Sequence, residues 1–273
     1  MSDLTINTDL ARKILNAFIH SEITRAGFNR AVIGLSGGID SALSCMLAAD
    51  ALGADNVLAV RMPFESSSQD SLDHAQQVIE TSGVRSLTIP ITAMVTPLFD
   101  QFPEMDNLRR GNAMARARMI VLYDQSAAFN GLIVGTSNKT EMLLGYSTQF
   151  GDAACALNPL GDLYKAQVRQ LAQAVGVPQA IIDKPPSADL WQGQTDEGEL
   201  GFTYEQADKL LYLLVDQRYT PEDCIAAGFA PAFVEQVVRR VQRSQYKRLM
   251  PPIAKLSNRT IGQDFLYLRD WGT

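Results

Sequence analysis

The sequence Ser36-Gly37-Gly38-Ile39-Asp40-Ser41 combines residue types that phosphate chemistry requires. An apolar run precedes it at 31–33 and mostly small and apolar residues follow at 42–49, which predicts a buried strand, a loop and then a helix. The free N–H groups at the start of such a helix and the positive end of its dipole favour a bound anion. The glycines allow the backbone to approach a phosphate closely. The sequence therefore predicts a phosphate-binding loop formed by Gly34, Leu35, Ser36, Gly37, Gly38, Ile39, Asp40 and Ser41.

Asp40 indicates that a cation accompanies the phosphate. A carboxylate in the first turn of a helix gains about 0.3–1 kcal/mol from the helix dipole. Facing a phosphate at about 4 Å, it would suffer a repulsion of about 4 kcal/mol at an effective dielectric constant of about 20. Because the repulsion is larger, we expect a metal ion between the two groups. Mg²⁺, which binds carboxylate and phosphate oxygens together, fits best; the alternative is an ordinary tight turn in which Asp40 caps the helix.

The loop differs from the commoner phosphate-binding patterns. It lacks the Lys before Ser/Thr that the Walker loop requires, and it lacks the G-x-G-x-x-G spacing. It resembles the S-G-G-x-D-S loop of ATP pyrophosphatases, enzymes that cleave ATP between its α- and β-phosphates and hold the departing pyrophosphate.

Apolar runs and amphipathic segments predict the elements that position this loop. Two short helices are expected to begin at Thr203, which forms a capping box with Gln206, and at Thr220-Pro221. Together the elements predict an α/β fold with a doubly wound parallel sheet and a helical C-terminal annex, in a single domain spanning 1–273. The strands are expected at 31–33, 57–63, 87–91 and 132–137, the longer helices at 8–24, 73–81, 112–129, 163–175 and 231–247, an irregular passage at 92–108, and a mobile lid at 184–201.

Composition narrows the class of protein. Of the 273 residues 46% are hydrophobic, and the formal net charge is -6. The acidity argues against a broad nucleic-acid surface. No apolar run is long enough to cross a bilayer, and the start of the chain predicts a helix rather than a signal peptide. The two histidines nearly exclude a histidine-built zinc site, and three cysteines without metal-type spacing favour a reducing compartment. We therefore expect a cytoplasmic protein that binds neither nucleic acid nor membranes.

Further segments resemble NAD+ synthetases, which belong to the ATP pyrophosphatase superfamily. The resemblance implies an adenine nucleotide alpha hydrolase-like, Rossmann-like fold and the last step of NAD+ biosynthesis, the ATP-dependent amidation of deamido-NAD+. In that reaction the nicotinate carboxylate attacks the α-phosphate of ATP, pyrophosphate leaves, and ammonia displaces AMP from the acyl-adenylate. The matching segments follow the family's order and are 111–119, 135–141, 145–152, 160–165 and 184–190.

The resemblance implies roles on the ATP side of the site. Asp40 and Glu141 would hold Mg²⁺. Thr136, Lys165 and Ser187 would contact ATP together with the phosphate loop. Lys165 would also act in catalysis, by offsetting negative charge that develops on the phosphates. A solvated surface pair of Glu141 and Lys165 is the alternative.

Other matching residues would lie on the deamido-NAD+ side, namely Arg116, Gln149, Tyr246 and Lys247. Ammonia is mostly ammonium at neutral pH, and Asp152 is the candidate base that removes its proton; a structural acid or helix cap is the alternative. The chain departs from many ammonia-using members, which carry Lys at position 149, Asp at 156 and His at 246 where it has Gln, Ala and Tyr.

Segments 145–152 and 245–248 resemble more the synthetase portion of glutamine-dependent members. Those members carry a glutaminase domain of a few hundred residues, for which this chain has no room. Free ammonia, or ammonia from a separate glutaminase subunit, is therefore implied. Family members are homodimers with the substrate site at or near the interface, so a homodimer is implied as well. Helix 112–129 and the C-terminal helices are candidates for that surface.

Two other functions compete with this interpretation. ATP pyrophosphatases that modify tRNA share the first loop, but they need basic surfaces and often a cysteine pair, which this acidic chain lacks. A nucleotide-sensing module without catalysis would not explain why Asp40, Glu141 and Lys165 occur together at the ends of strands or loops.

Overall fold

The first strand is the centre of the sheet. The computed structural model describes residues 4–187, 189–191, 193–262 and 264. Strand β1 (Ala31–Gly34) pairs in parallel with β2 (Val57–Arg61) on one side and β4 (Leu132–Ile133) on the other, and β3 (Arg85–Thr88) lies outside β2. The order β3-β2-β1-β4 winds the sheet in both directions from β1, as predicted.

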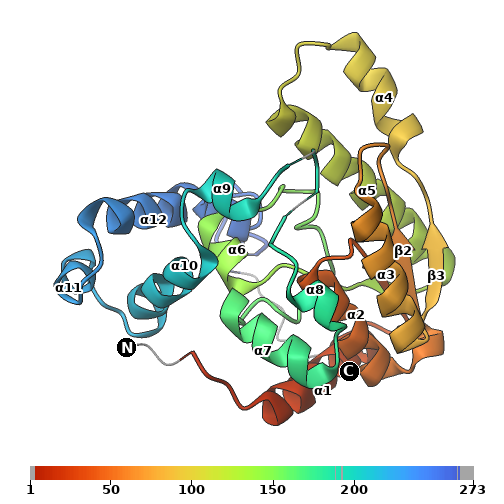
Figure 1. Ribbon diagram of the computed structural model, residues 1–273, viewed down its shortest axis with the longest axis horizontal. Coiled ribbons are helices and arrows are strands. Elements are labelled where there is room, and N and C mark those ends of the chain that lie inside the picture. Colours follow the sequence, from red (N-terminus) through yellow and green to blue (C-terminus); the bar gives the residue numbers. More distant parts are fainter. Residues whose placement is uncertain (1–3, 188, 192, 263, 265–273) are drawn as a thin grey trace.

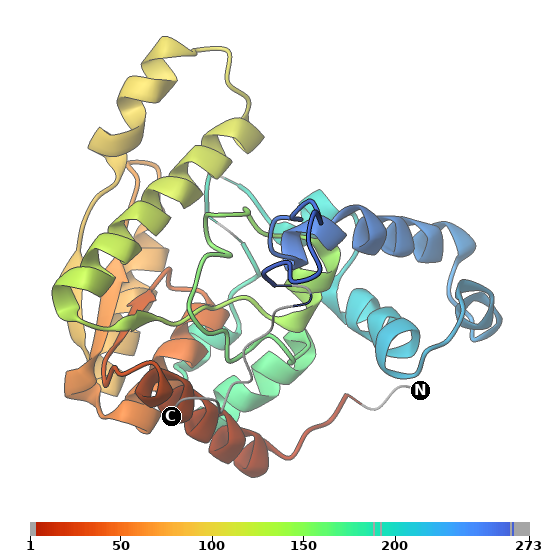
Figure 2. The same ribbon diagram turned by 180° about the vertical axis from the view of Figure 1, so that it is seen from behind.

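Alternate side chains of β1 enter different cores, one on each face of the sheet. Ile33 packs in a core with α1 (Thr8–Arg25), α2 (Ile39–Leu52), α3 (Gln69–Ser82) and α7 (Lys165–Val175). Val32 packs in another with α4 (Thr92–Gln101) and α5 (Asn107–Phe129). Helix α3 therefore lies in front of the sheet in Figure 1, and α5 lies in front of it in Figure 2, which shows the molecule from behind.

A third core joins α6 (Lys139–Leu144) to the helices that follow residue 203. The buried side chains of this core include Leu144, Leu211 and Val237. These helices are the predicted C-terminal annex, on the left in Figure 1. In order they are α10 (Tyr204–Leu211), its π-helical continuation η2 (Tyr212–Asp216), α11 (Pro221–Ala226), α12 (Pro231–Arg243) and the 3-10 turn η3 (Gln245–Arg248). Three short elements lie earlier in the chain, namely η1 (Ala54–Asn56), α8 (Gln179–Ile182) and α9 (Asp196–Leu200).

The expectation of an irregular passage at 92–108 is wrong. Residues 92–101 form α4 although Pro97 lies inside it. The helix survives the missing N–H because Val95 and Phe99, four residues apart, both pack into the core shared with α5. Helix α5 also begins at Asn107, five residues earlier than expected, because Asp106 caps it by accepting a hydrogen bond from the N–H of Arg109.

Strand β3 and helix α7 also differ from expectation at their ends, β3 beginning at Arg85 rather than 87 and α7 at Lys165 rather than 163.

The expectation of an unpacked lid at 184–201 is wrong for the residues described there. Gln194, Asp196 and Leu200 are buried, and α9 forms within the segment. Among the helices that the described residues form, none is long and apolar enough to span a bilayer.

Candidate active site

The predicted phosphate loop lies where the winding of the sheet reverses. It leaves the carboxyl end of β1, between β2 and β4, which is where open parallel sheets bind ligands. Gly37 has a φ of +81°, and a Cβ atom there would lie 2.1 Å from the backbone oxygen of Ser71 at the start of α3. The Ser41 hydroxyl donates to the Gly38 carbonyl oxygen at 2.9 Å, which fixes the end of the loop on α2.

Three charged residues from the first turns of three helices meet beside this loop. Asp40 lies in the first turn of α2, Glu141 in that of α6, and Lys165 is the first residue of α7. The Lys165 ammonium lies 2.5 Å from Asp40 Oδ2 and 3.0 Å from Glu141 Oε1. Only 4% of the lysine side chain is exposed. The structure thus brings together the three residues that the sequence singled out, and a solvated surface pair is excluded.

The charges in this cluster depend on one another. Burial lowers the pKa of Lys165, but the charges and hydrogen bonds of Asp40 and Glu141 outweigh it and raise the pKa above its usual value. Burial also raises the pKa of Glu141, and the nearby Asp40 carboxylate raises it further, whereas Lys165 opposes both. Two carboxylates share this small volume because a cation lies between them.

The sequence reasoning missed two residues that complete the cluster. Asn138 is fully buried, and its Nδ2 donates to Asp40 Oδ1 at 2.8 Å. The Tyr204 ring lies under the Lys165 ammonium, 5.1 Å from ring centroid to Nζ. A local signal for Asn138 exists, since Asn-x-x-Glu is a capping pattern and the structure contains that capping box. No local signal marks Tyr204.

The donor set fits a divalent cation that also binds substrate oxygens. Asp40 and Glu141 contribute two carboxylates, the number with which Mg²⁺ commonly binds a protein when phosphate oxygens complete its shell. Within the part of the chain that the structure describes, no three His, Cys, Asp or Glu side chains gather in a way that would enclose a metal.

A second cluster surrounds the loop of residues 145–152. Arg116 on α5 donates to the carbonyl oxygen of Gln149 at 3.3 Å. The Lys247 ammonium donates to the carbonyl oxygens of Gly145 at 2.8 Å and Ser147 at 2.6 Å. Lys247 therefore holds the shape of the loop, and the candidate residues Arg116, Gln149 and Lys247 come together at it.

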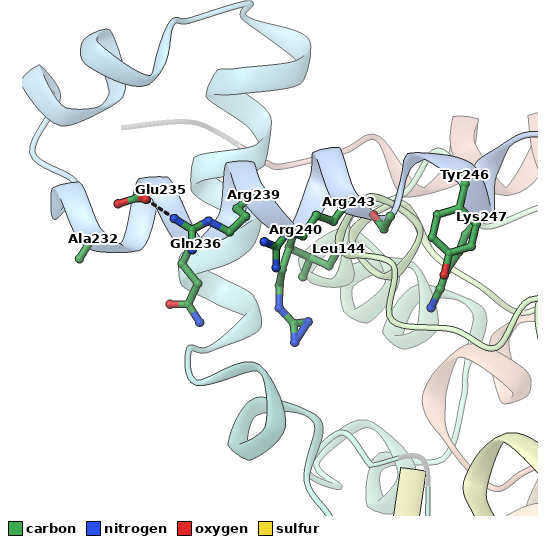
Figure 3. A pocket seen from close by; sticks show the side chains of 10 residues that line it. Leu144, Ala232, Glu235, Gln236, Arg239, Arg240, Arg243, Tyr246 and Lys247 are labelled. Atoms are coloured by element: carbon green, nitrogen blue, oxygen red, sulfur yellow. Dashed lines mark hydrogen bonds and ion pairs between the residues drawn. The ribbon is translucent and has the colours of Figure 1, made fainter. Parts of the chain in front are cut away.

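Tyr246 and Lys247 lie at one end of a groove along α12. The groove has a volume of about 390 Å³, and Arg239, Arg240 and Arg243 line it further along the helix (Figure 3). Tyr246 is 60% exposed. The groove does not include Asp40, Glu141 or Lys165.

Asp152 closes the same loop. One of its carboxylate oxygens accepts a hydrogen bond from the Thr148 N–H at 2.8 Å. The Asp152 side chain is exposed, and the hydrogen bond from Thr148 and the nearby charge of Lys247 favour its charged form. A charged carboxylate that solvent can reach is able to accept a proton, as the candidate base requires. Arg118 is a further charge near Asp152 and is the more buried of the two arginines in the middle of α5.

Thr136 and Ser187 are the two other residues that are expected to contact ATP. Thr136 follows β4 and is half-buried, beside Gly135, whose carbonyl oxygen accepts from the Ser44 hydroxyl of α2 at 3.2 Å. The Ser187 hydroxyl donates to the Gln194 carbonyl oxygen at 2.7 Å, inside its own segment. That segment is tied to α3 by the bond from Lys184 Nζ to the Ser71 hydroxyl, at 2.8 Å.

The sheet, its winding and the loop at the reversal define the class of α/β proteins with the adenine nucleotide hydrolase-like fold. The family model described as NAD synthase matches residues 11–251. The chain belongs to the NAD synthase family, and it is accordingly a ligase.

Relatives agree with this assignment. The chain is 58% identical over 272 residues, the whole of both chains, to an "NH(3)-dependent NAD(+) synthetase" of Trichlorobacter lovleyi. Among solved structures, the NMN synthetase of Francisella tularensis has a TM-score of 0.81 at 32% identity, over 92% of this chain and 99% of that one. The NH3-dependent NAD synthetase of Campylobacter jejuni has a TM-score of 0.78 at 30% identity, over 92% and 100%.

Proposed function

We propose that this chain makes NAD+ from deamido-NAD+ and ammonia at the expense of ATP, through an acyl-adenylate, releasing AMP and pyrophosphate. The observation that carries the proposal is the buried cluster of Asp40, Lys165 and Glu141 beside a glycine loop at the switch point of the sheet. Full-length similarity to NH3-dependent NAD+ synthetases supports the choice of substrates.

On the ATP side, the loop from Gly34 to Ser41 binds the pyrophosphate part of ATP through its N–H groups. Asp40 and Glu141 hold Mg²⁺, which when bound offsets the negative charge of the phosphates. The Lys165 ammonium stabilises the charge that grows on the bridging and leaving oxygens as the α–β bond breaks. Thr136 and Ser187 contact the rest of the nucleotide.

On the dinucleotide side, Arg116, Gln149, Tyr246 and Lys247 form the wall of the deamido-NAD+ site around loop 145–152. Arg116 and Tyr246 are exposed to incoming substrate, and Arg116 also donates to the Gln149 carbonyl oxygen. Lys247 acts through the loop carbonyls that it holds. Asp152 accepts the proton of ammonium, so that neutral ammonia attacks the acyl-adenylate.

We further propose that the protein is a cytoplasmic homodimer that uses free ammonia or ammonia from a separate glutaminase subunit, and that sheet and annex act as one domain. All three cysteines are free thiols, which suits a reducing compartment. A groove of about 500 Å³ on α4 and α5, lined by Met94, Leu98 and Ile120, together with Arg116, supplies an apolar face at which a second copy would lie near the substrate residues.

The test supplies ATP, Mg²⁺, ammonium and deamido-NAD+, and follows NAD+ and AMP. The proposal expects the two products in equal amounts; ADP in place of AMP would exclude it. Because one relative is described as an NMN synthetase, a parallel reaction offers the mononucleotide. A preference for the mononucleotide would retain the chemistry and change the substrate.

A further inference from the structure

Helix α10 directs a carboxylate at the place where α6 and α7 begin. Asp208 is fully buried, and its Oδ1 accepts a hydrogen bond from the Thr140 hydroxyl of α6 at 2.5 Å. Its Oδ2 accepts from the backbone N–H of Ala166, in the first turn of α7, at 2.8 Å. The Thr140 hydroxyl oxygen in turn accepts from the N–H of Lys165 at 3.0 Å. The first two N–H groups of α7 are therefore satisfied by side chains of two other helices.

A second carboxylate repeats the arrangement at the end of η2. Asp216 Oδ1 lies 2.8 Å from the Lys139 ammonium of α6, and Oδ2 accepts from the Tyr164 hydroxyl at the N-cap of α7. Asp208 and Asp216 thus join neighbouring residues of α6 to neighbouring residues of α7. The bridges touch residues 139–140 and 164–166, directly beside Glu141 and around Lys165.

From this juxtaposition we propose that Asp208 is a positioning residue for the adenylation step, acting through Thr140 to fix the Lys165 ammonium relative to the Glu141 carboxylate. The inference rests on the proposed function, since it concerns the reaction in which those two groups act. Nothing in the chemistry requires Asp208 to touch a substrate.

The hydrogen-bond directions explain why this position takes a carboxylate. Because the Thr140 oxygen accepts from Lys165, its proton points to Asp208, and the Ala166 N–H points there as well. Two donors therefore need two acceptors, which aspartate supplies and asparagine does not. Burial raises the pKa of Asp208, and the hydrogen bonds from Thr140 and the backbone, together with the nearby charge of Lys165, oppose the rise.

The main experiment compares Thr140→Val with Thr140→Ser. Valine keeps the shape but removes the hydroxyl, whereas serine restores it. ATP–pyrophosphate exchange in the presence of deamido-NAD+ gives kcat and KM for the adenylation step, and thermal unfolding gives Tm. We expect Thr140→Val to lower kcat by about tenfold to a hundredfold with a smaller change in KM for ATP, because small misplacements of a catalytic group cost this much. Thr140→Ser should recover most of the loss.

Asp208→Asn should show the same split between kcat and KM, since it leaves one donor without an acceptor. If Thr140→Val does not fold, Asp208→Asn replaces it in the comparison with the wild type. The matched control is Glu205→Gln, which removes a carboxylate from the exposed face of the same helix, where Glu205 forms an ion pair with Lys209. Its exchange rate should equal that of the wild type.

A double-mutant cycle separates positioning from general stability. If Thr140 acts through Lys165, Thr140→Val should change the residual exchange rate little once Lys165→Met has removed the ammonium. Equal effects of Thr140→Val in both backgrounds, or a wild-type kcat with a lowered Tm, would overturn the inference and leave the proposed function intact. Absence of exchange in the wild-type protein would overturn both.

Discussion

At the scale of single residues, the ammonium of Lys165 occupies the position between two carboxylates that a divalent cation would also favour. Asp40 and Glu141 remain close together because Lys165 offsets their repulsion, and all three side chains are largely buried. A bound Mg²⁺ would share the carboxylates with the lysine or displace it from them. The lysine and the metal are therefore coupled through the same oxygen atoms.

This coupling predicts the response of Lys165→Met to Mg²⁺. Removing one partner of a buried ion pair leaves uncompensated charge and costs about 3–5 kcal/mol of stability. Because the lysine then no longer offsets the charge of the two carboxylates, added Mg²⁺ should raise the Tm of Lys165→Met by more than it raises the Tm of the wild type. Thermal unfolding with and without MgCl₂ measures this, and Asp40→Asn in the same background should reduce the gain. An equal rise in wild type and variant would show that the metal does not use these carboxylates.

A second prediction at this scale concerns Asp152. Asp152→Asn should leave ATP–pyrophosphate exchange near the wild-type rate and abolish amide formation, because the base is needed only after the adenylate forms. Asp55→Asn, an exposed aspartate in η1, is the matched control and should leave both steps unchanged. An equal loss of both steps in Asp152→Asn would remove Asp152 from the role of base.

The role of Asp152 as the base also predicts a dependence on pH. A carboxylate must be charged to accept a proton, so the acid that protonates Asp152 removes the base. Amide formation should therefore fall as pH decreases, and ATP–pyrophosphate exchange should fall less over the same range. Rates of the two steps measured from neutral to acidic pH provide the check.

The residues of the cluster differ in how far the sequence predicts them. Asp40, Glu141 and Lys165 lie in segments that resemble NAD+ synthetases, so the resemblance implied their roles, and the structure brings the three side chains together. The contacts that hold them are non-local, since Asn138 reaches Asp40 across 98 residues and Asp208 reaches Thr140 across 68. No spacing along the chain encodes such pairs. The first depends on where α6 begins beside α2, and the second on the packing of α10 against α6 and α7.

At the scale of elements, the phosphate loop is held against the start of α3 by the absence of a side chain at Gly37. A Cβ atom there would clash with the Ser71 backbone oxygen, and the left-handed φ of +81° adds strain. Gly176 has a similar φ of +92° but nothing within 4 Å of an added Cβ. An alanine at Gly37 would therefore introduce both backbone strain and a steric clash, whereas an alanine at Gly176 would introduce backbone strain alone.

Gly37→Ala should therefore abolish ATP binding, because the loop must move away from α3. Gly176→Ala should keep ATP binding and lose only about 1–2 kcal/mol of stability, the usual cost of a left-handed alanine. Isothermal titration with a non-hydrolysable ATP analogue and urea unfolding measure the two effects. Wild-type ATP affinity in Gly37→Ala would contradict the assignment of this loop to phosphate binding.

Elements were predictable where local chemistry determines them. The strand, glycine loop and helix around Gly37 and the capping box at Thr203 follow from sequence alone and are present. Helix α4 was missed because Pro97 argues against a helix, and only the packing of Val95 and Phe99 on α5 overrides it. The segment 184–201 was misjudged for a related reason. Its polar side chains are satisfied partly inside the segment, as where Ser187 donates to Gln194, and partly by residues outside it, as where Asp196 accepts from Tyr146.

At the scale of the whole molecule, the annex and the sheet meet at the active cluster. Asp40 comes from the sheet side and Glu141 from α6, while Lys165 belongs to α7, which packs against both α2 and α10. Alternation of strands and helices predicted a parallel, doubly wound sheet, which is present. It did not predict that residues after 203 complete the lysine environment, because helical periodicity gives an apolar face but not the surface on which it packs.

The outer face of α4 and α5 gives the last prediction. It exposes Met94 and Leu98 to solvent, together with Ile120, which is 56% exposed. Several exposed apolar side chains along one groove mark an interface more often than a free surface. We therefore expect a dimer by light scattering, and we expect Ile120→Asp to convert it to a monomer and weaken deamido-NAD+ binding through nearby Arg116. The matched control is Ile14→Asp on α1, since Ile14 is also 56% exposed but lies on another helix. A dimer that tolerates Ile120→Asp and not Ile14→Asp would move the interface to α1.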